Sequence, residues 1–280
     1  MIARTALAKH CAALMSAMAL IVTACTAARA QEREVDVELL IAVDVSRSMN
    51  FKELEIQRRG YAAALTDPQV LDAMFSGLTG RVAIAFLEWA GDGSQSVIVP
   101  WREIAKPEDA RAVAEMLRTR PSMTMRFTSI SGAILTGMQM FENNGFAGLK
   151  RVIDVSGDGP NNQGAPVEEA RDLAVANGII INGLPLMTTG DGLSRYAIPF
   201  LDRYYIDCVI GGPASFSLPV DRWEAFPEAV RRKLVLELAH APPGTGRDGA
   251  ANALPVTRIA DRSKVDCLIG ERLRMQWDLQ

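Results

Sequence analysis

The segment "LLIAVDVSRSMN" (Leu39–Asn50) changes from apolar to polar within a few residues. Its first half is a continuous apolar run, which is typical of a strand buried on both faces of a sheet. Its second half places Asp44, Ser46 and Ser48 at every second position, and side chains at such spacing in an extended chain face the same side. We therefore predict a buried strand whose carboxyl end presents one carboxylate and two hydroxyls together.

Apolar runs of strand length recur along the chain and alternate with patterns of helical period. We expect strands at 37–45, 81–90, 95–101, 150–157 and 179–186. We expect helices at 51–65, 107–120, 129–143 and 165–178. This alternation predicts an α/β domain with a mostly parallel central sheet and helices on both faces. The turn signal "GDGS" (Gly91–Ser94) joins the second and third strands, which should form a hairpin and leave one antiparallel strand at an edge.

Beyond Leu186 the pattern is weaker, and three further elements should complete the domain. We expect a helix at 196–210, a short last strand in "SFSLPV" (Ser215–Val220) and an amphipathic helix at 226–241. The region 242–255 is rich in Pro, Gly and Ala, which is typical of a flexible linker. We therefore assign residues 31–240 to one domain and residues 241–280 to a flexible linker with a short C-terminal segment.

The N-terminal leader, residues 1–30, has the features of a secretory signal peptide. Arg4 and Lys9 give a positive start. The apolar run Cys11–Ala24 is shorter than the about 20 residues of a membrane-spanning helix. "ARA" (Ala28–Ala30) then matches the small-x-small pattern of a cleavage site. We predict a periplasmic or secreted bacterial protein with no membrane span after cleavage.

Two other interpretations of the leader stay open. "VTAC" (Val22–Cys25) resembles the lipobox of bacterial lipoproteins, in which Cys25 would carry a lipid anchor. A buried core helix is the third interpretation, although the charge and cleavage pattern at this position are typical of a leader.

Cysteine usage and net charge narrow the function classes. After the leader only Cys208 and Cys267 remain. In an oxidising compartment such a pair is most simply a disulfide, and two free buried thiols are the alternative. The bridge would tie the C-terminal segment back to the domain. The net charge is −3 and no basic block occurs, so we do not expect nucleic acid as a partner.

Two further segments should place polar side chains at the same sheet edge as Asp44. "RFTSISGAI" (Arg126–Ile134) has Thr128 just before a helix, and "RVIDVSGDG" (Arg151–Gly159) ends a strand with Asp158 between two glycines. In open parallel sheets, ligands bind at the carboxyl ends of the strands. Carboxylate and hydroxyl oxygens are the ligands that Mg²⁺ and Mn²⁺ prefer.

Together the three segments resemble the metal-ion-dependent adhesion site (MIDAS) of the von Willebrand factor type A (vWA) domain. That family has D-x-S-x-S, then a Thr on a second loop, then an Asp followed by Gly on a third. The matching residues are Asp44, Ser46, Ser48, Thr128 and Asp158. The resemblance covers residues 35–239 and implies a Rossmann-like α/β fold. The leader, "DCVIGG" (Asp207–Gly212) and the cysteine-bearing tail also resemble an uncharacterised bacterial family of secreted proteins built on this domain.

The resemblance implies a protein-binding module rather than an enzyme. Asp44, Ser46 and Ser48 would hold Mg²⁺ directly, with Mn²⁺ or Ca²⁺ as alternatives. Thr128 would bind the ion directly in one state, and Asp158 would bind it directly or through water. An Asp or Glu carboxylate of a partner protein would complete the metal shell.

The third loop departs from the family pattern. "SGDG" replaces the common Thr-Asp-Gly, which leaves Ser156 as the hydroxyl that could take the place of the missing threonine beside Asp158. We interpret Asp154 as a buried, hydrogen-bonded carboxylate rather than a ligand. Asn182, in the next strand, has no assigned role.

A metal-dependent hydrolase, either phosphatase or esterase, is the alternative function for the same site. His240 is the only histidine after the leader, and the sequence contains neither a G-x-S-x-G nor a Walker motif. Asp44 could in principle be a phosphorylated nucleophile, but phosphatases of that type need an acid where Ser46 stands. A domain that has lost its ligand is the third interpretation.

Overall fold

A computed structural model describes residues 32–120, 123–188, 196–239 and 264–279. The predicted leader and linker lie outside these residues. By its internal contacts the chain divides into two units, Met1–Arg33 and Glu34–Gln280, and the second holds the helices and nearly all of the sheet. None of the described helices combines the length and the apolar character needed to cross a membrane.

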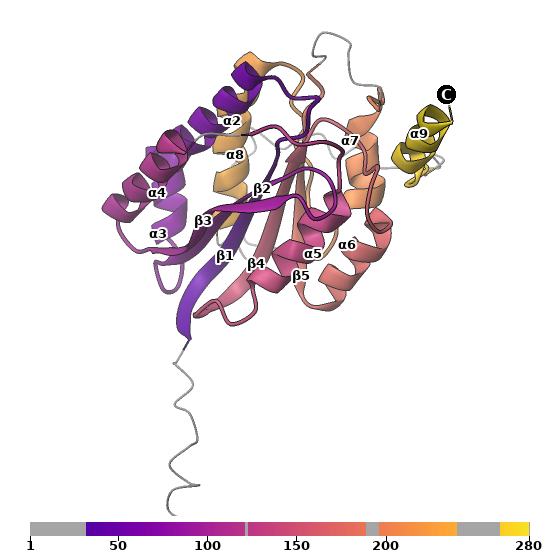
Figure 1. The fold of residues 1–280 in the computed structure, drawn as a ribbon. Coiled ribbons are helices and arrows are strands. Elements are labelled where there is room, and N and C mark those ends of the chain that lie inside the picture. The colour runs from indigo at the N-terminus through magenta and orange to yellow at the C-terminus, as the bar shows by residue number, and fades with distance from the viewer. Residues whose placement is uncertain (1–31, 121–122, 189–195, 240–263, 280) are drawn as a thin grey trace, which may run out of the picture. The chain divides into compact units, whose positions relative to one another are not determined.

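The second unit is built on a five-stranded sheet in the order β3-β2-β1-β4-β5 (Figure 1). The strands are β1 (Arg33–Asp44), β2 (Val82–Trp89), β3 (Gln95–Ile104), β4 (Phe146–Gly157) and β5 (Ile179–Pro185). The pairs β1–β2 and β4–β5 are parallel, and β3 runs antiparallel to β2 at one edge. The sheet therefore confirms the mostly parallel α/β fold with one antiparallel edge strand.

Helices cover both faces of this sheet (Figure 1). The α-helices are α2 (Phe51–Ala64), α3 (Pro68–Phe75), α4 (Pro107–Thr119), α5 (Ile130–Met140), α6 (Val167–Ala176), α7 (Leu201–Tyr204), α8 (Phe226–Leu238) and α9 (Ile269–Asp278). A π-helical turn, Tyr205–Val209, continues α7, and a 3₁₀ turn, Trp223–Ala225, precedes α8.

The sheet separates two apolar clusters because alternate residues of a strand face opposite sides. In β1, Leu39, Ile41 and Val43 belong to the cluster that also contains side chains of α2, α3, α4 and α8. Leu40 and Ala42 belong to the cluster with α5, α6 and α7. All five side chains are buried, which explains why the first strand is continuously apolar.

A capping box fixes the start of α2 directly after the polar end of the quoted segment. The side chain of Asn50 accepts a hydrogen bond from the Glu53 amide at 3.0 Å, and the Asn50 amide donates to the Glu53 carboxylate at 2.8 Å. The helix therefore begins at Phe51, and residues 45–50 form a short loop between β1 and α2.

Most of the expected elements are present, with shifted ends, and two helices were not predicted. The first is α3, which Asp67 caps and Pro68 opens. The second is α9, in the segment that we expected only to be tied back. The predicted helix at 196–210 is confirmed only from Leu201 to Val209, as α7 and the π-helical turn.

The predicted last strand at Ser215–Val220 is not a regular strand of the sheet. It makes isolated bridges from Ser217 to Gly183 and from Val220 to Leu186, beside β5. The amides of Leu218 and Val220 donate to Gly183 and Pro185. Pro219 lies between them and has no N–H for any strand on the other side, so this segment can only form an irregular edge.

Candidate metal-binding site

Asp44 ends β1 and is fully buried. Its Oδ1 accepts a hydrogen bond from the Ser46 amide at 2.6 Å, which turns the chain out of the strand. Its Oδ2 is also buried but has no hydrogen-bond partner in the described structure. A methyl group at Gly157, the last residue of β4, would lie 2.9 Å from this Oδ2. Gly157 is therefore the residue that leaves room for the Asp44 carboxylate between the two strand ends.

A chain of hydrogen bonds joins the hydroxyls of the first loop to the third loop. The Ser46 and Ser48 hydroxyl oxygens are 2.8 Å apart, and the Ser48 hydroxyl donates to Asp158 Oδ1 at 2.7 Å. Ser46 is buried, whereas Ser48 and Asp158 are partly exposed. The structure thus brings together four of the five predicted site residues, including two that are 110 positions apart.

Thr128, the fifth predicted residue, lies at the same edge of the sheet. Its amide donates to the Asn162 side chain at 2.9 Å, and the Asn162 amide donates to the Thr128 carbonyl at 2.8 Å. Its loop is also attached to the first loop, through the Met125 amide and the Val45 carbonyl at 3.0 Å. Within the described residues, however, no hydrogen bond joins Thr128 to the other four predicted residues.

The backbone just before Thr128 is strained. Phe127 has a φ of 66°, in the left-handed region that bulky residues rarely adopt. Non-glycine residues in this region are held there by their surroundings and are frequent at functional sites. The conformation of Phe127 therefore supports the second loop as part of a site.

The two carboxylates of this cluster, Asp44 and Asp158, are close enough for their charges to interact. Burial, followed by the charge of Asp158, raises the pKa of Asp44 well above its ordinary value. Burial raises the pKa of Asp158 to about 6, although the hydrogen bond from Ser48 opposes the shift. No ion pair to a Lys or Arg of the described chain reaches either carboxylate. A hard divalent cation fits such a group of oxygens, one of which is buried and unpartnered.

Hydroxyls would have to supply part of any metal shell here. The described residues contain no group of three or more His, Cys, Asp or Glu side chains that could hold a metal ion. Two carboxylates with Ser46, Ser48 and Thr128 nevertheless give a set of hard oxygens that suits Mg²⁺ or Mn²⁺ and leaves room for other ligands.

Asp154 has a different environment from Asp44 and Asp158. It is fully buried and forms an ion pair with Lys233 of α8 at 2.9 Å. Lys233 also donates to Glu237 at 2.5 Å, and Asn182 donates to the same Glu237 oxygen at 3.0 Å. Asp154 is buried as expected, but neither of its oxygens has a hydrogen-bond partner among the described residues, and its contact is instead an ion pair with a lysine in a helix predicted only as amphipathic. Asn182 gains a role as a link between β5 and α8.

Three residues of the site were not found from the sequence. The Tyr205 hydroxyl is buried, has no hydrogen-bond partner among the described residues, and would lie 3.0 Å from a methyl group at Gly157. Asn161 and Asn162 follow Asp158 and hold the second loop. No sequence pattern distinguishes them, because a tyrosine in a helical run and an asparagine in a loop are both ordinary. The Ser156 hydroxyl is buried and has no hydrogen-bond partner among the described residues, so no hydrogen bond links it to Asp158.

The disulfide predicted between Cys208 and Cys267 is present, with the two Cα atoms 5.5 Å apart. It joins the π-helical turn to the residues just before α9. The bridge confirms that the C-terminal segment is tied back to the domain, and both cysteines are buried in the second apolar cluster.

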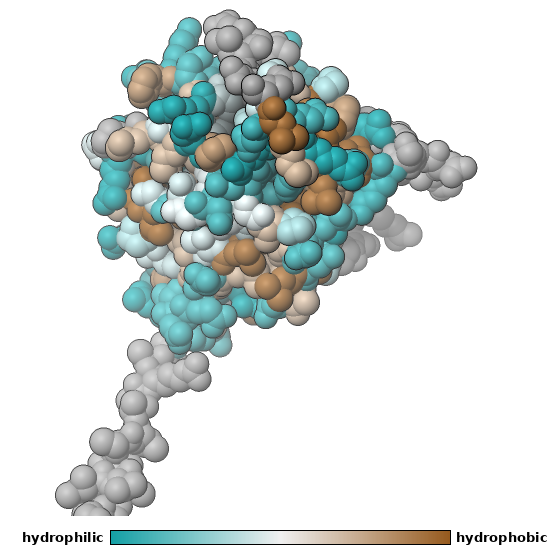
Figure 2. All heavy atoms as spheres, turned by 45° about the vertical axis from the view of Figure 1, so that its right-hand side comes forward, coloured by the Kyte–Doolittle hydropathy of each residue, from teal (hydrophilic) through white to brown (hydrophobic). Residues whose placement is uncertain are grey.

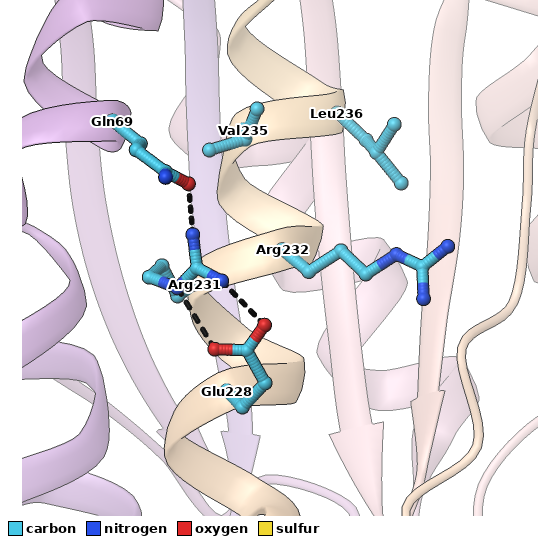
Figure 3. Close-up of a pocket in the computed structure, with 6 residues that line it drawn as sticks. All are labelled: Gln69, Glu228, Arg231, Arg232, Val235 and Leu236. Atoms are coloured by element: carbon cyan, nitrogen blue, oxygen red, sulfur yellow. Dashed lines mark hydrogen bonds and ion pairs between the residues drawn. The ribbon is translucent and has the colours of Figure 1, made fainter. Parts of the chain in front are cut away.

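The structure also has a surface hollow between α3 and α8, away from the predicted ligands (Figure 3). Its lining residues are Gln69, Glu228, Arg231, Arg232, Val235 and Leu236. Arg231 is already occupied, since it contacts both Glu228 and Gln69. The hollow therefore offers no arrangement comparable to the cluster at Asp44.

Comparison with solved structures defines the class of fold. The chain resembles a von Willebrand factor type A protein from Catenulispora acidiphila, with 14% identity and a TM-score of 0.52 over 73% of this chain and 43% of that chain. It also resembles the pilus adhesin SpaC from Lactobacillus rhamnosus GG in its open conformation, with 14% identity and a TM-score of 0.54 over 74% and 31%. The domain therefore has a vWA-like fold.

A third similar structure is proximal thread matrix protein 1 from the mussel byssus, described with a zinc-occupied MIDAS motif. It is 12% identical, with a TM-score of 0.53 over 73% of this chain and 46% of that chain. This chain spans less than half the length of each of the three proteins. At these identities the likeness establishes the fold alone.

The sequence itself identifies the family. Residues 34–242 match the family described as "Protein of unknown function (DUF1194)". The chain belongs to this family. No curated protein matches the sequence.

Proposed function

We propose that this domain binds a partner protein through a divalent cation, most simply Mg²⁺, held at the carboxyl end of the sheet. Asp44, Ser46 and Ser48 would be the ligands from the first loop. Thr128 and Asp158 would complete the protein's share of the shell. An Asp or Glu of the partner would occupy the remaining position, where a bound cation attracts a carboxylate strongly.

One observation carries this proposal: a buried carboxylate with an unpartnered oxygen stands beside a second carboxylate, and no cation of the described chain compensates them. Leaving such charges buried and unpaired is costly. A divalent ion would remove the cost and would satisfy Asp44 Oδ2. The likeness to a pilus adhesin and to a protein with a zinc-occupied MIDAS motif supports the same interpretation.

The proposal extends to where the protein works. The disulfide between Cys208 and Cys267 favours an oxidising compartment such as the periplasm or the extracellular space. The leader would direct export and would then be removed by cleavage. Lipidation of Cys25 would instead anchor the domain at a membrane surface. Mass spectrometry of the protein purified from its host would distinguish the two N-termini.

A calorimetric titration tests the metal site. The mature protein should bind Mg²⁺ at neutral pH, and Asp44→Ala should abolish binding while the circular dichroism spectrum stays unchanged. Asp72→Ala, which removes an exposed carboxylate of α3, is the matched control and should bind like the parent. Equal affinity in the parent and Asp44→Ala would show that the ion binds elsewhere.

An activity screen separates the binding module from the hydrolase alternative. Phosphatase and esterase substrates should not be turned over in Mg²⁺ or Mn²⁺ above the rate of Asp44→Ala. Turnover that needs both the cation and Asp44 would replace the binding function by a metal-dependent hydrolase at the same site.

A further inference from the structure

The C-terminal helix α9 touches the loop that follows Asp158. Gly270, in its first turn, approaches so closely that a methyl group there would lie 2.0 Å from the Asn161 carbonyl oxygen. The side chain of Asn161 donates to Glu271 Oε1 at 2.6 Å. Any larger residue at position 270 would push the helix away from the loop, so this contact depends on glycine.

The same loop holds the second loop of the candidate site. Asn161 Oδ1 accepts from the Ser131 amide at 3.0 Å, and Asn162 exchanges two hydrogen bonds with the backbone of Thr128. Asn161 and Asn162 are both fully buried. A displacement of Asn161 and Asn162 would therefore move Thr128 as well.

A second contact from α9 reaches the strained residue beside Thr128. The Arg274 guanidinium lies 4.4 Å from the centre of the Phe127 ring, and it donates to the Asn162 carbonyl at 3.3 Å. Such a cation–aromatic contact stabilises the ring position by a modest amount. Arg274 thus touches Asn162 and Phe127, the residue that precedes Thr128.

The position of α9 depends on the disulfide. Gly270 is the only buried residue of α9, and Ile269 and Leu273 are only partly buried against the second apolar cluster, so the disulfide adds a covalent link to a limited apolar contact. Cys267 is buried, bonded to Cys208, and its carbonyl accepts from the Tyr204 hydroxyl at 3.3 Å. The bridge fixes the chain two residues before α9 begins.

We propose that α9 is a positioning clamp for the metal site: the disulfide holds it against Asn161 and Asn162, and these residues set the position of Thr128. Glu271 and Arg274 are its positioning residues. The proposal deepens the proposed function and rests on it, because it assigns the clamp to the loops that would bind the ion. It predicts that ion binding weakens when the bridge is absent although every ligand remains.

Hydrogen exchange and metal affinity together test the clamp. In the double variant Cys208→Ser, Cys267→Ser, the amides of Thr128 and Asn162 in the metal-free protein should exchange about tenfold faster than in the parent. The Kd for Mg²⁺ should rise about tenfold, the size of effect that loss of outer-shell support has on metal sites. Both measurements should be made well below the unfolding temperature of the variant.

A second set of variants keeps the disulfide, in case the cysteine variant does not fold. Glu271→Ala with Arg274→Ala should produce the same two changes, about three- to tenfold each. Glu271→Gln should keep the parent affinity, because its amide oxygen still accepts from Asn161. Arg272→Ala is the matched control on the same helix, since the ion pair of Arg272 within the described part of the chain is with Asp266 at the surface.

The outcomes separate the two proposals. If the parent binds no divalent cation, the proposed function fails, and the exchange rates still decide whether α9 holds the loops. If the parent binds Mg²⁺ but the clamp variants leave both the Kd and the exchange rates unchanged, the clamp is overturned and the metal site stands.

Discussion

Two pairs of acidic side chains in this domain can be compared, and among the described residues only one of these pairs has a cation from the chain. Asp154 and Glu237 share Lys233, which is buried between them at 2.9 and 2.5 Å. Asp44 and Asp158 have hydroxyl and amide donors but no ion pair among the described residues. Burial alone would lower the pKa of Lys233, yet Asp154 and Glu237 raise it above its ordinary value. The first pair is thus balanced by a lysine, whereas no positive side chain of the described residues forms an ion pair with the second.

The difference indicates the role of each pair of carboxylates. A buried ion pair that the chain completes by itself links α8 to the sheet and needs nothing from outside. A pair of acids at the end of the sheet, open to solvent through Ser48 and Asp158, is destabilised unless an external cation arrives. In the surface view, small apolar patches are separated by polar surface on the face shown (Figure 2). The charge of Asp44 and Asp158 therefore indicates a function more specifically than the surface hydropathy does.

The largest expected effect is on stability and comes from removing the positive charge of Lys233. Lys233→Met should lower the free energy of unfolding by about 3–5 kcal/mol at neutral pH, because Asp154 and Glu237 stay buried without a partner. Urea denaturation measures this. Arg232→Met, at the exposed neighbouring position of α8, should change stability by less than about 0.5 kcal/mol. A Lys233→Met protein as stable as the parent would show that the two pairs do not differ as described.

Removing a charge from the pair Asp44 and Asp158 should not destabilise the metal-free protein. Asp44→Asn keeps the hydrogen bond from Ser46 but relieves the buried charge, so the metal-free protein should be at least as stable as the parent. Its affinity for Mg²⁺ should fall by about a hundredfold or more, which corresponds to about 2.7 kcal/mol. Denaturation and calorimetry on the same sample measure both. A destabilised Asp44→Asn would place Asp44 with Asp154 as a structural residue.

Binding of a partner protein should depend on the divalent cation at Asp44 and not on the buried Lys233. Chelation by EDTA, or replacement of the partner's key acid, should weaken binding about tenfold or more, about 1.4 kcal/mol. A pull-down from periplasmic extract, with the parent and Asp44→Ala as baits and with or without EDTA, identifies candidate partners. Binding that is equal in EDTA would place the contact surface away from Asp44.

The smallest expected effect is the pH dependence of ion binding. Protons compete with the cation, and with the pKa of Asp158 at about 6 the Mg²⁺ affinity should fall about fourfold between pH of about 7.5 and about 5.5. Metal-free stability should change in the other direction. Because the folded pKa is raised, the contribution of Asp158 is fully present at low pH and is lost as the pH rises through about 6.

Thermal unfolding with and without Mg²⁺ across this pH range checks the sign. Added Mg²⁺ should raise the unfolding temperature more at the upper end of the range than at the lower end. Asp158→Asn is the control, because it should reduce the change near pH of about 6 in the metal-free protein, while Asp44 and Asp154, whose pKa values are also raised, keep their own contributions. A metal-free protein that becomes more stable as the pH rises would contradict the raised pKa.

The sequence by itself determined the sheet and the contents of its carboxyl edge. The strand at Leu39–Asp44 is continuously apolar because both of its faces are covered, and this is a local signal. The alternation of strands and helices then places the ends of β1 and β4 at one edge. For this reason Asp44, Ser46, Ser48 and Asp158 could be expected together, and the structure joins them by hydrogen bonds.

Only the tertiary structure decided how the buried charges are balanced and what supports the loops. Lys233 belongs to an amphipathic pattern, and only the packing of α8 on the sheet places it against Asp154. The clamp of α9 depends on contacts between residues about 110 positions apart, such as Asn161 with Glu271. Periodicity and spacing describe neighbours along the chain, whereas the partner of a buried charge is set by which elements pack together.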